Sequence, residues 1–227
     1  MLSICVLLFF CFISAPSIYG KELVEYFDNA QHIYGGTGQI VLPSTKVVNR
    51  SKYVFSIHGF DINAVYGIYE KCEVGVFFNL KTLSSLISMG NIQEKIREIY
   101  FHFKYQIFKI DEFPLEISCG IHGLGPTVYL VVSRKIKNYY SYIGVFFKQD
   151  TNLYLKPFFS ISIIRGMSMF VVDYRADDET LHLGWKFLLS PKIKFDINFV
   201  KINEIKNLIQ LRDIFFNNFI FGLSYSE

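Results

Sequence analysis

The sequence has few cysteines and, beyond its first twenty residues, no long apolar run. Four of its 227 residues are cysteine, and only Cys72 and Cys119 lie beyond residue 20. A secreted scaffold held by disulfides needs more cysteines in a shorter chain, so this class is excluded. No run of about 18 apolar residues follows residue 20, which excludes a transmembrane helix.

The net charge is also small, and no motif of a metal, cofactor or catalytic site is present. The charge of +3 is spread along the chain, so we expect no nucleic-acid partner. None of the five histidines has the spacing of a helical metal site, and no Cys-x-x-Cys occurs. Gly35, Gly36 and Gly38 precede an extended stretch rather than a helix, so they predict no phosphate-binding loop. We therefore predict no catalytic residue, no cofactor and no metal.

Alternation of apolar and polar residues is what the sequence does contain. It runs almost without a slip through residues 101–107, 181–187, 193–199 and 219–225. Successive side chains of a strand point to opposite faces, so each stretch has one apolar and one polar face. The apolar faces are aromatic, in a chain that is 18% aromatic, and the polar faces carry full charges. A closed antiparallel meander in a bilayer, apolar outside and polar within, explains both faces.

The spacing of these stretches predicts an all-β transmembrane β-barrel of about 12 strands, in a range of roughly 10 to 14. Residues 37–48 are expected to be extended, with a break at Pro43, and a short helix is expected at 92–98. The two longest connections, 81–98 and 203–213, fall at the same end, as the outer loops of such barrels do. The candidate strands are 51–60, 63–69, 73–80, 99–109, 115–121, 127–135, 140–148, 152–163, 167–175, 179–188, 193–202 and 214–226.

The register of the strands assigns residues to the two faces of the barrel wall. We expect a lumen-facing polar network of mixed sign, paired across the bore, at Glu73, Asn79, Lys104, Gln106, Glu116, Asp173, His182, Lys186, Lys194, Asp196 and Asn198. We expect lipid-facing side chains at Phe101, Phe103, Tyr105, Leu183, Trp185, Phe187, Phe195, Phe199, Phe219, Phe221 and Tyr225. Cys119 falls in register with the apolar face and is expected to be a small apolar filler.

The N-terminus predicts export. Residues 1–20 contain an apolar core from Ile4 to Ile13 and then the small residues Ala15, Ser17 and Gly20, the pattern of a secretory signal peptide. We expect cleavage after Gly20, with Ser17 as an alternative. A periplasmic lead-in at 21–36 and a single barrel domain at 37–227 follow.

Several segments resemble the YjbH-like family of bacterial outer-membrane proteins. They are GGTGQIVLPSTKVV at 35–48, KCEVGVFFNL at 71–80, FKYQIFKIDEFPLEISCGIHGL at 103–124, TVYLVVSRKI at 127–136 and FIFGLSYSE at 219–227. The resemblance implies an outer-membrane barrel and, by association, a link with exopolysaccharide production or export. It implies no catalytic residue.

We therefore expect a structural or export-associated protein of the bacterial outer membrane, with both termini periplasmic. Its expected partners are outer-membrane lipids, the barrel-assembly machinery and polysaccharide-export components. Three alternatives stay open: a narrow channel, a lipid-modifying enzyme, and a soluble lipocalin-like barrel whose apolar face points inward. For the enzyme, the best candidates are Ser56 and His58, which share a face of one strand, although no Gly-x-Ser-x-Gly motif occurs.

Overall fold

The computed structural model describes residue 27 and residues 38–80, 99–110, 115–122, 127–149, 153–202 and 218–227. The predicted signal peptide, most of the predicted lead-in, the predicted helix at 92–98 and the predicted long connections 81–98 and 203–213 lie outside the described residues. No helix among the described residues is long and apolar enough to cross a membrane.

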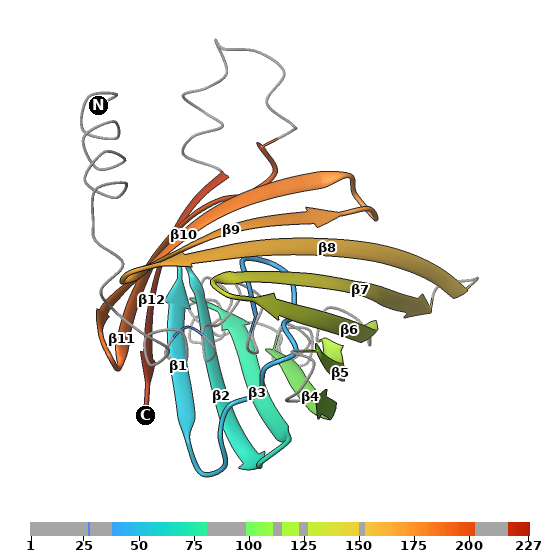
Figure 1. Ribbon diagram of the computed structural model, residues 1–227, viewed down its shortest axis with the longest axis horizontal. Coiled ribbons are helices and arrows are strands. Elements are labelled where there is room, and N and C mark those ends of the chain that lie inside the picture. The colour runs from blue at the N-terminus through green and yellow to red at the C-terminus, as the bar shows by residue number, and fades with distance from the viewer. Residues whose placement is uncertain are drawn as a thin grey trace, which may run out of the picture.

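Twelve antiparallel strands in these ranges close into one barrel (Figure 1). Each strand pairs with its neighbours in sequence, and β1 pairs with β12, with Val54 opposite Ser226 and His58 opposite Gly222. The predicted closed, all-β antiparallel meander of about 12 strands is confirmed. The strands are β1 (Tyr53–His58), β2 (Asp61–Tyr69), β3 (Cys72–Asn79), β4 (Ile99–Ile110), β5 (Leu115–His122), β6 (Thr127–Ile136), β7 (Tyr139–Gln149), β8 (Leu153–Arg165), β9 (Ser168–Arg175), β10 (Thr180–Ser190), β11 (Ile193–Phe199) and β12 (Phe219–Ser226).

Short turns join the strands at one end of the barrel. The connections 70–71, 137–138, 166–167 and 191–192 have two residues each and share this end, because alternate connections of a meander lie together. In two of these hairpins a turn residue adopts the positive φ that favours a tight turn, Lys137 at 54° and Gly166 at 56°. We call this the short-turn end. The C-terminal residue Glu227 lies there too, since its N–H donates to the carbonyl of Tyr53 at the start of β1.

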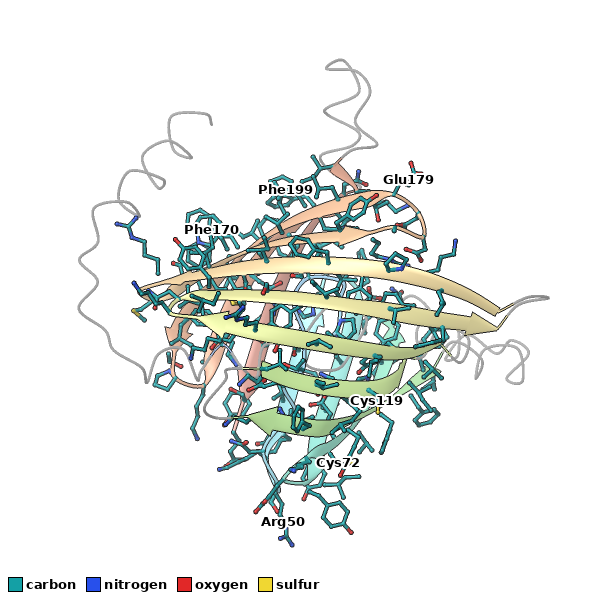
Figure 2. The ribbon with its side chains drawn as sticks, turned by 45° about the vertical axis from the view of Figure 1, so that its right-hand side comes forward. Arg50, Cys72, Cys119, Phe170, Glu179 and Phe199 are labelled. Carbon is teal, nitrogen blue, oxygen red and sulfur yellow. The ribbon has the colours of Figure 1, made fainter. Side chains whose placement is uncertain are left out.

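The pleat sorts the side chains as the alternation predicts. Along β1, the side chains of Val54, Ser56 and His58 are buried, while those of Tyr53, Phe55 and Ile57 are exposed. On the outer side, aromatic rings stack from strand to strand, for example Phe170 on Trp185. Figure 2 shows Phe170 and Phe199 on this outer wall.

The interior of the barrel is filled by the chain itself. Residues 38–48, here called the plug segment, precede β1 and are almost all buried, with Leu42, Thr45 and Val48 at zero exposure. In Figure 1 this segment is the blue trace that passes among the strands before it joins β1. The predicted extended conformation is wrong for its first half. The N–H of Gln39 donates to the carbonyl of Leu42 at 2.9 Å, and Gly38 pairs with Pro43, so the chain reverses direction there.

One side of the bore is apolar and receives the tip of the plug segment. Ile40, Val41 and Leu42 belong to one buried cluster with Phe27 and with inward residues of β6 to β10. The wall residues of the cluster are Tyr129, Val131, Tyr140, Tyr142, Phe146, Phe158, Ile164, Met169, Val171 and Leu188. Gly144 makes room for this packing, because a Cβ there would meet the ring of Phe158 and the carbonyl of Leu130.

We predict that Gly144→Ala lowers the free energy of unfolding by about 1–3 kcal/mol, since the ring of Phe158 must move to admit the methyl group. The change is measured from urea-unfolding midpoints of the refolded barrel. Ala64→Val on the outer wall, where the side chain borders open space, is the control and should have little effect. Equal stability of the Gly144→Ala variant and the unmutated protein would contradict the packing described here.

Candidate functional site

The bore is the candidate site, because it holds the buried charges together with the plug segment. The turn at its tip is held by two charges of opposite sign. Asp173 on β9 accepts hydrogen bonds at its Oδ2 from the N–H groups of Ile40 (2.9 Å) and Val41 (3.0 Å). The hydroxyl of Ser160 on β8 donates to the other carboxylate oxygen at 2.6 Å. Asp173 therefore satisfies two backbone donors that have no strand to pair with.

Lys186 on β10 holds the carbonyl side of the same turn. Its ammonium donates to the carbonyls of Gln39 (2.5 Å) and Gly38 (3.3 Å). The turn thus lies between two charged groups. The carboxylate of Asp173 accepts hydrogen bonds from its N–H groups, and the ammonium of Lys186 donates hydrogen bonds to its C=O groups. We call Asp173 and Lys186 the tip clamp.

Glu73 on β3 organises a second group of contacts near the base of the plug segment. Its Oε2 accepts from the N–H of Val48 at 2.7 Å, and its Oε1 lies 3.2 Å from Lys104 Nζ and 2.9 Å from His102 Nε2. Lys104 also donates to the carbonyl of Lys46 at 2.8 Å. Glu73 and Lys104 have no solvent exposure, so each depends on the other for its counter-charge.

Glu116 on β5 binds the middle of the plug segment. It accepts from the Thr45 hydroxyl at 2.9 Å and pairs with the Lys46 ammonium at 2.8 Å. Ser118 donates to the Thr45 carbonyl at 2.5 Å, and Ser133 lies 2.6 Å from the Thr45 hydroxyl. Gln106 on β4 also donates to the Thr45 carbonyl, at 3.4 Å. Residues of β4, β5 and β6 thus surround this one threonine.

A third polar group lies on the side of the bore formed by β1, β11 and β12. Ser56 Oγ lies 3.4 Å from His58 Nδ1, and His58 Nε2 lies 3.3 Å from Asp196 Oδ1. Asn63 donates to Ser56 at 3.3 Å, and Asn198 donates to Asp196. The order serine, histidine, aspartate is that of a nucleophile with its base and orienting acid. All three side chains are buried, with Ser56 at zero exposure.

Gly222 explains how His58 and Asp196 meet. It lies between them on β12, opposite both residues in the register. A Cβ at Gly222 would occupy the space where the imidazole and the carboxylate approach each other. The sequence pattern does not indicate Asp196 as a partner of His58, since only the placement of β12 between β1 and β11 brings the two together.

The structure places the predicted network residues in the bore. All of them are buried except Asn79, which is half-buried near the end of β3 and donates to Asp61. Their partners differ from the prediction of pairing across the bore: Glu73, Lys104, Gln106, Glu116, Asp173 and Lys186 all bind the plug segment. Lys194 and His182 bind residues of the wall on the same or a neighbouring strand, or just beyond its end, rather than residues across the bore. Lys194 donates to Ser226 at 3.3 Å, and His182 lies 3.0 Å from the Thr180 hydroxyl and accepts from the N–H of Lys201.

The predicted outward residues lie on the outer wall with different exposures. Phe101, at 74%, is the most exposed, and Phe103, Tyr105, Leu183, Phe221 and Tyr225 are also exposed. Trp185, Phe187, Phe195, Phe199 and Phe219 are half-buried, because neighbouring aromatic rings cover them. Cys119 is half-buried on this wall and Cys72 is buried, and both are free thiols.

The turn 176–179 carries an ion pair that is separate from the bore contacts. Arg175 donates to Asp177 through both Nε, at 2.9 Å, and a terminal nitrogen. Partial burial would raise the pKa of Asp177, but the hydrogen bond and the charge of Arg175 outweigh it and hold the pKa below its ordinary value. Figure 2 shows Glu179 of this turn at the far side of the barrel from Arg50.

No group of three or more histidine, cysteine or acidic residues in the described ranges is arranged to hold a metal ion. No protein-family model matches the chain, and no curated protein matches it. The bore contacts themselves therefore carry the functional argument.

We predict that Glu73→Gln lowers the free energy of unfolding by about 3 kcal/mol, since it leaves the buried Lys104 without its counter-charge. The double variant with Lys104→Met should recover part of this loss, because it removes the uncompensated charge. Urea unfolding of both variants gives the two numbers. Glu179→Gln, which removes an exposed carboxylate, is the control, and an equal loss in that variant would contradict the burial argument.

Proposed function

We propose that this chain is a bacterial outer-membrane β-barrel with a structural or export-associated role in the cell envelope. The observation that carries the proposal is the inversion of the usual distribution of side chains. The outer wall is apolar and aromatic, with rings such as Phe101 exposed, while seven charged side chains of the described residues are buried inside. A barrel surrounded by lipid has this arrangement, because contact with the acyl chains is favourable for apolar side chains and costly for charged ones.

The buried charges argue against the soluble, lipocalin-like alternative. A soluble barrel of that type keeps its apolar side chains inside, around a cavity for a hydrophobic ligand. Here charged and hydroxyl side chains line much of the bore, and the plug segment lies inside it. The exposed aromatic wall would also favour aggregation of a protein in water.

The short-turn end supports an orientation. Outer-membrane barrels have short turns at the periplasmic end and longer loops outside. Under this proposal the short-turn end and Glu227 face the periplasm, while the two-residue turn 59–60 lies at the outer end. We propose in addition that the predicted signal peptide directs export of the chain. The barrel-assembly machinery then inserts it into the outer membrane.

The link with exopolysaccharide production rests on the resemblance to the YjbH-like family. The filled bore favours a structural or accessory role over a permanently open porin. Lipids of the outer membrane and components of polysaccharide export are the partners of the proposal.

We predict that Phe103→Lys prevents assembly in the membrane, because a charge on the outer wall costs about 2–4 kcal/mol near the bilayer midplane. Fractionation of cells, together with the heat-dependent gel mobility of the folded barrel, measures the effect. Phe103→Leu is the matched control and should assemble like the unmutated protein. The proposal fails if the unmutated protein fractionates as soluble and binds a hydrophobic ligand.

A lipid-modifying enzyme is the second candidate, and one observation favours it. The sequence pattern shows no carboxylate that orients His58 beside Ser56, and in the structure Asp196 lies in this position. Against it, Asn63 lies within hydrogen-bonding distance of both Ser56 and His58, and Ser56 has no exposed surface through which a lipid reaches it. The hydrogen-bonded network therefore explains these residues without catalysis.

We predict that Ser56→Ala leaves the lipid profile of cells unchanged, since the serine acts as a wall residue. Mass spectrometry of lipids from cells with the unmutated protein, the variant and no protein makes the comparison. Asn63→Ala serves as a control for a change of packing in the same group. A lipid species that is lost both without the protein and in Ser56→Ala would establish the enzyme instead.

A further inference from the structure

We infer that the plug segment is a displaceable gate, and that its withdrawal opens a cation-preferring pore through the barrel. The inference rests on the proposed placement in a membrane and adds a second state of the same bore. Five points support it: the sheet is complete without the segment, water can replace its contacts, the base of the segment is anchored, the barrel has 12 strands, and the charges balance only when the segment is inside.

The barrel wall does not need the plug segment for its strand pairing. Closure is made by β1 and β12, with five residue pairs in register. Among the described residues, the plug segment joins no ladder of the wall, and its bridge from Gly38 to Pro43 is internal. Withdrawal of the segment therefore breaks no pairing between strands.

The contacts that hold the segment are ones that water can take over. Asp173, Lys186, Lys104 and Glu116 bind backbone groups or polar side chains of the segment. In a flooded bore these charges and the freed backbone groups are hydrated instead. Gln39 Oε1, buried and without a hydrogen-bond partner among the described residues, gains one on release. The apolar tip, packed on Tyr129 and Phe158, favours the closed state at rest.

The base of the segment is fixed where it meets the sheet. The N–H of Ser51 donates to the carbonyl of Gly67 at 2.8 Å, and the N–H of Gly67 donates to the carbonyl of Lys52 at 3.0 Å. Ser51 adopts a φ of 61° to make this turn. The part that moves is thus residues 38–48, while the turn before β1 remains anchored to β2.

The number of strands supports a hydrated path once the segment has left the bore. The bore now holds the wall side chains and, in addition, a chain reversal in which Gly38 and Pro43 lie side by side. Barrels of about 8 strands are filled by their own side chains, whereas those of about 16 leave an aqueous channel. A barrel of 12 strands falls between them, and here a peptide fills the difference.

The charges of the wall determine which ions the open bore prefers. Among the described residues, the buried charged side chains are three lysines (104, 186 and 194) and four carboxylates (73, 116, 173 and 196), which leaves one negative charge with the histidines neutral. Lys46 of the plug segment, paired with Glu116, brings this balance to zero. When the segment leaves, Lys46 leaves with it, and the bore becomes negative. Acidic pore linings favour cations.

The structure offers a covalent lock for the gate. A Cβ built on Gly184 lies 2.7 Å from Cγ1 of Ile40 and 2.6 Å from Oδ1 of Asn198, so a cysteine there reaches a cysteine at position 40 once the Asn198 amide shifts. The lock is Ile40→Cys with Gly184→Cys, in a background where Cys72 and Cys119 are replaced by alanine. The release variant is Asp173→Asn with Lys186→Met, which removes the tip clamp and keeps the net charge of the bore. The matched control is Asp177→Asn with Arg175→Met, the ion pair in the turn between the same two strands.

Conductance of the purified full-length protein in planar bilayers tests the gate, after flotation with liposomes has shown insertion. The unmutated protein and the control should give little steady conductance. The release variant should conduct at least tenfold more often, with a reversal potential in a KCl gradient that shows preference for K⁺. Adding the oxidised lock to the release variant should abolish the current, and a reductant should restore it.

Three results overturn the inference: an inserted release variant that stays closed, a current that persists with the lock oxidised, or a preference for chloride. Failure of the unmutated protein to enter liposomes refutes the membrane placement itself, and flotation separates this result from failure of the gate. If only the release variant fails to fold, labelling of a single Ile40→Cys by a hydrophilic maleimide decides the question with the clamp intact. Labelling faster than global unfolding supports the gate, and labelling no faster than unfolding refutes it.

Discussion

Buried charge without water is the constraint on which this structure depends. Among the described residues, seven Lys, Asp and Glu side chains are buried inside the wall, and each needs partners, because an unpaired buried ion costs several kcal/mol. The strands alone do not supply enough of them, since their backbone groups are already paired in the sheet. The plug segment does, because its chain reversal leaves N–H and C=O groups unpaired. Asp173 accepts hydrogen bonds from two of these N–H groups, and Lys186 donates to two of these carbonyls. The wall charges and the backbone of the segment thus satisfy each other's hydrogen-bonding groups.

The period of the strands decides which residues meet in the bore, and glycines decide how closely they meet. Alternation delivers every second side chain to the interior, where bulky groups from neighbouring strands compete for space. Gly222 lets His58 and Asp196 approach across β12, and Gly184 leaves space for Ile40 of the plug segment. Small residues on the inner face therefore act as sites of close approach, while the outer wall, free of this competition, carries rings such as Phe101 and Phe103.

Local pattern was enough to predict the strands but not what fills them. The alternation at 99–109 predicted a strand that the structure places at Ile99–Ile110, because the period of a pleated strand is written in adjacent residues. The plug segment escaped prediction since its main contact, from Ile40 to Asp173, spans 133 positions in sequence. The apolar side of the bore was missed for a related reason. The inward residues Tyr129 and Phe158 share one buried cluster with Ile40 and Leu42 of the plug segment, and a strand's own sequence does not show what lies opposite it in the bore.

The distribution of the plug contacts also constrains the order of folding. The segment precedes β1 in the chain, yet it binds β3, β4 and β5 through Glu73, Lys104 and Glu116, and β9 and β10 through Asp173 and Lys186. These two groups of strands lie on different sides of the ring and face each other only when the meander has come round to β12. The segment therefore has no complete binding site until the sheet closes. The contacts of the plug segment therefore stabilise the closed barrel rather than any single hairpin. Because these contacts lie outside the sheet ladders, the binding of the segment and the pairing of the wall are separate sets of interactions.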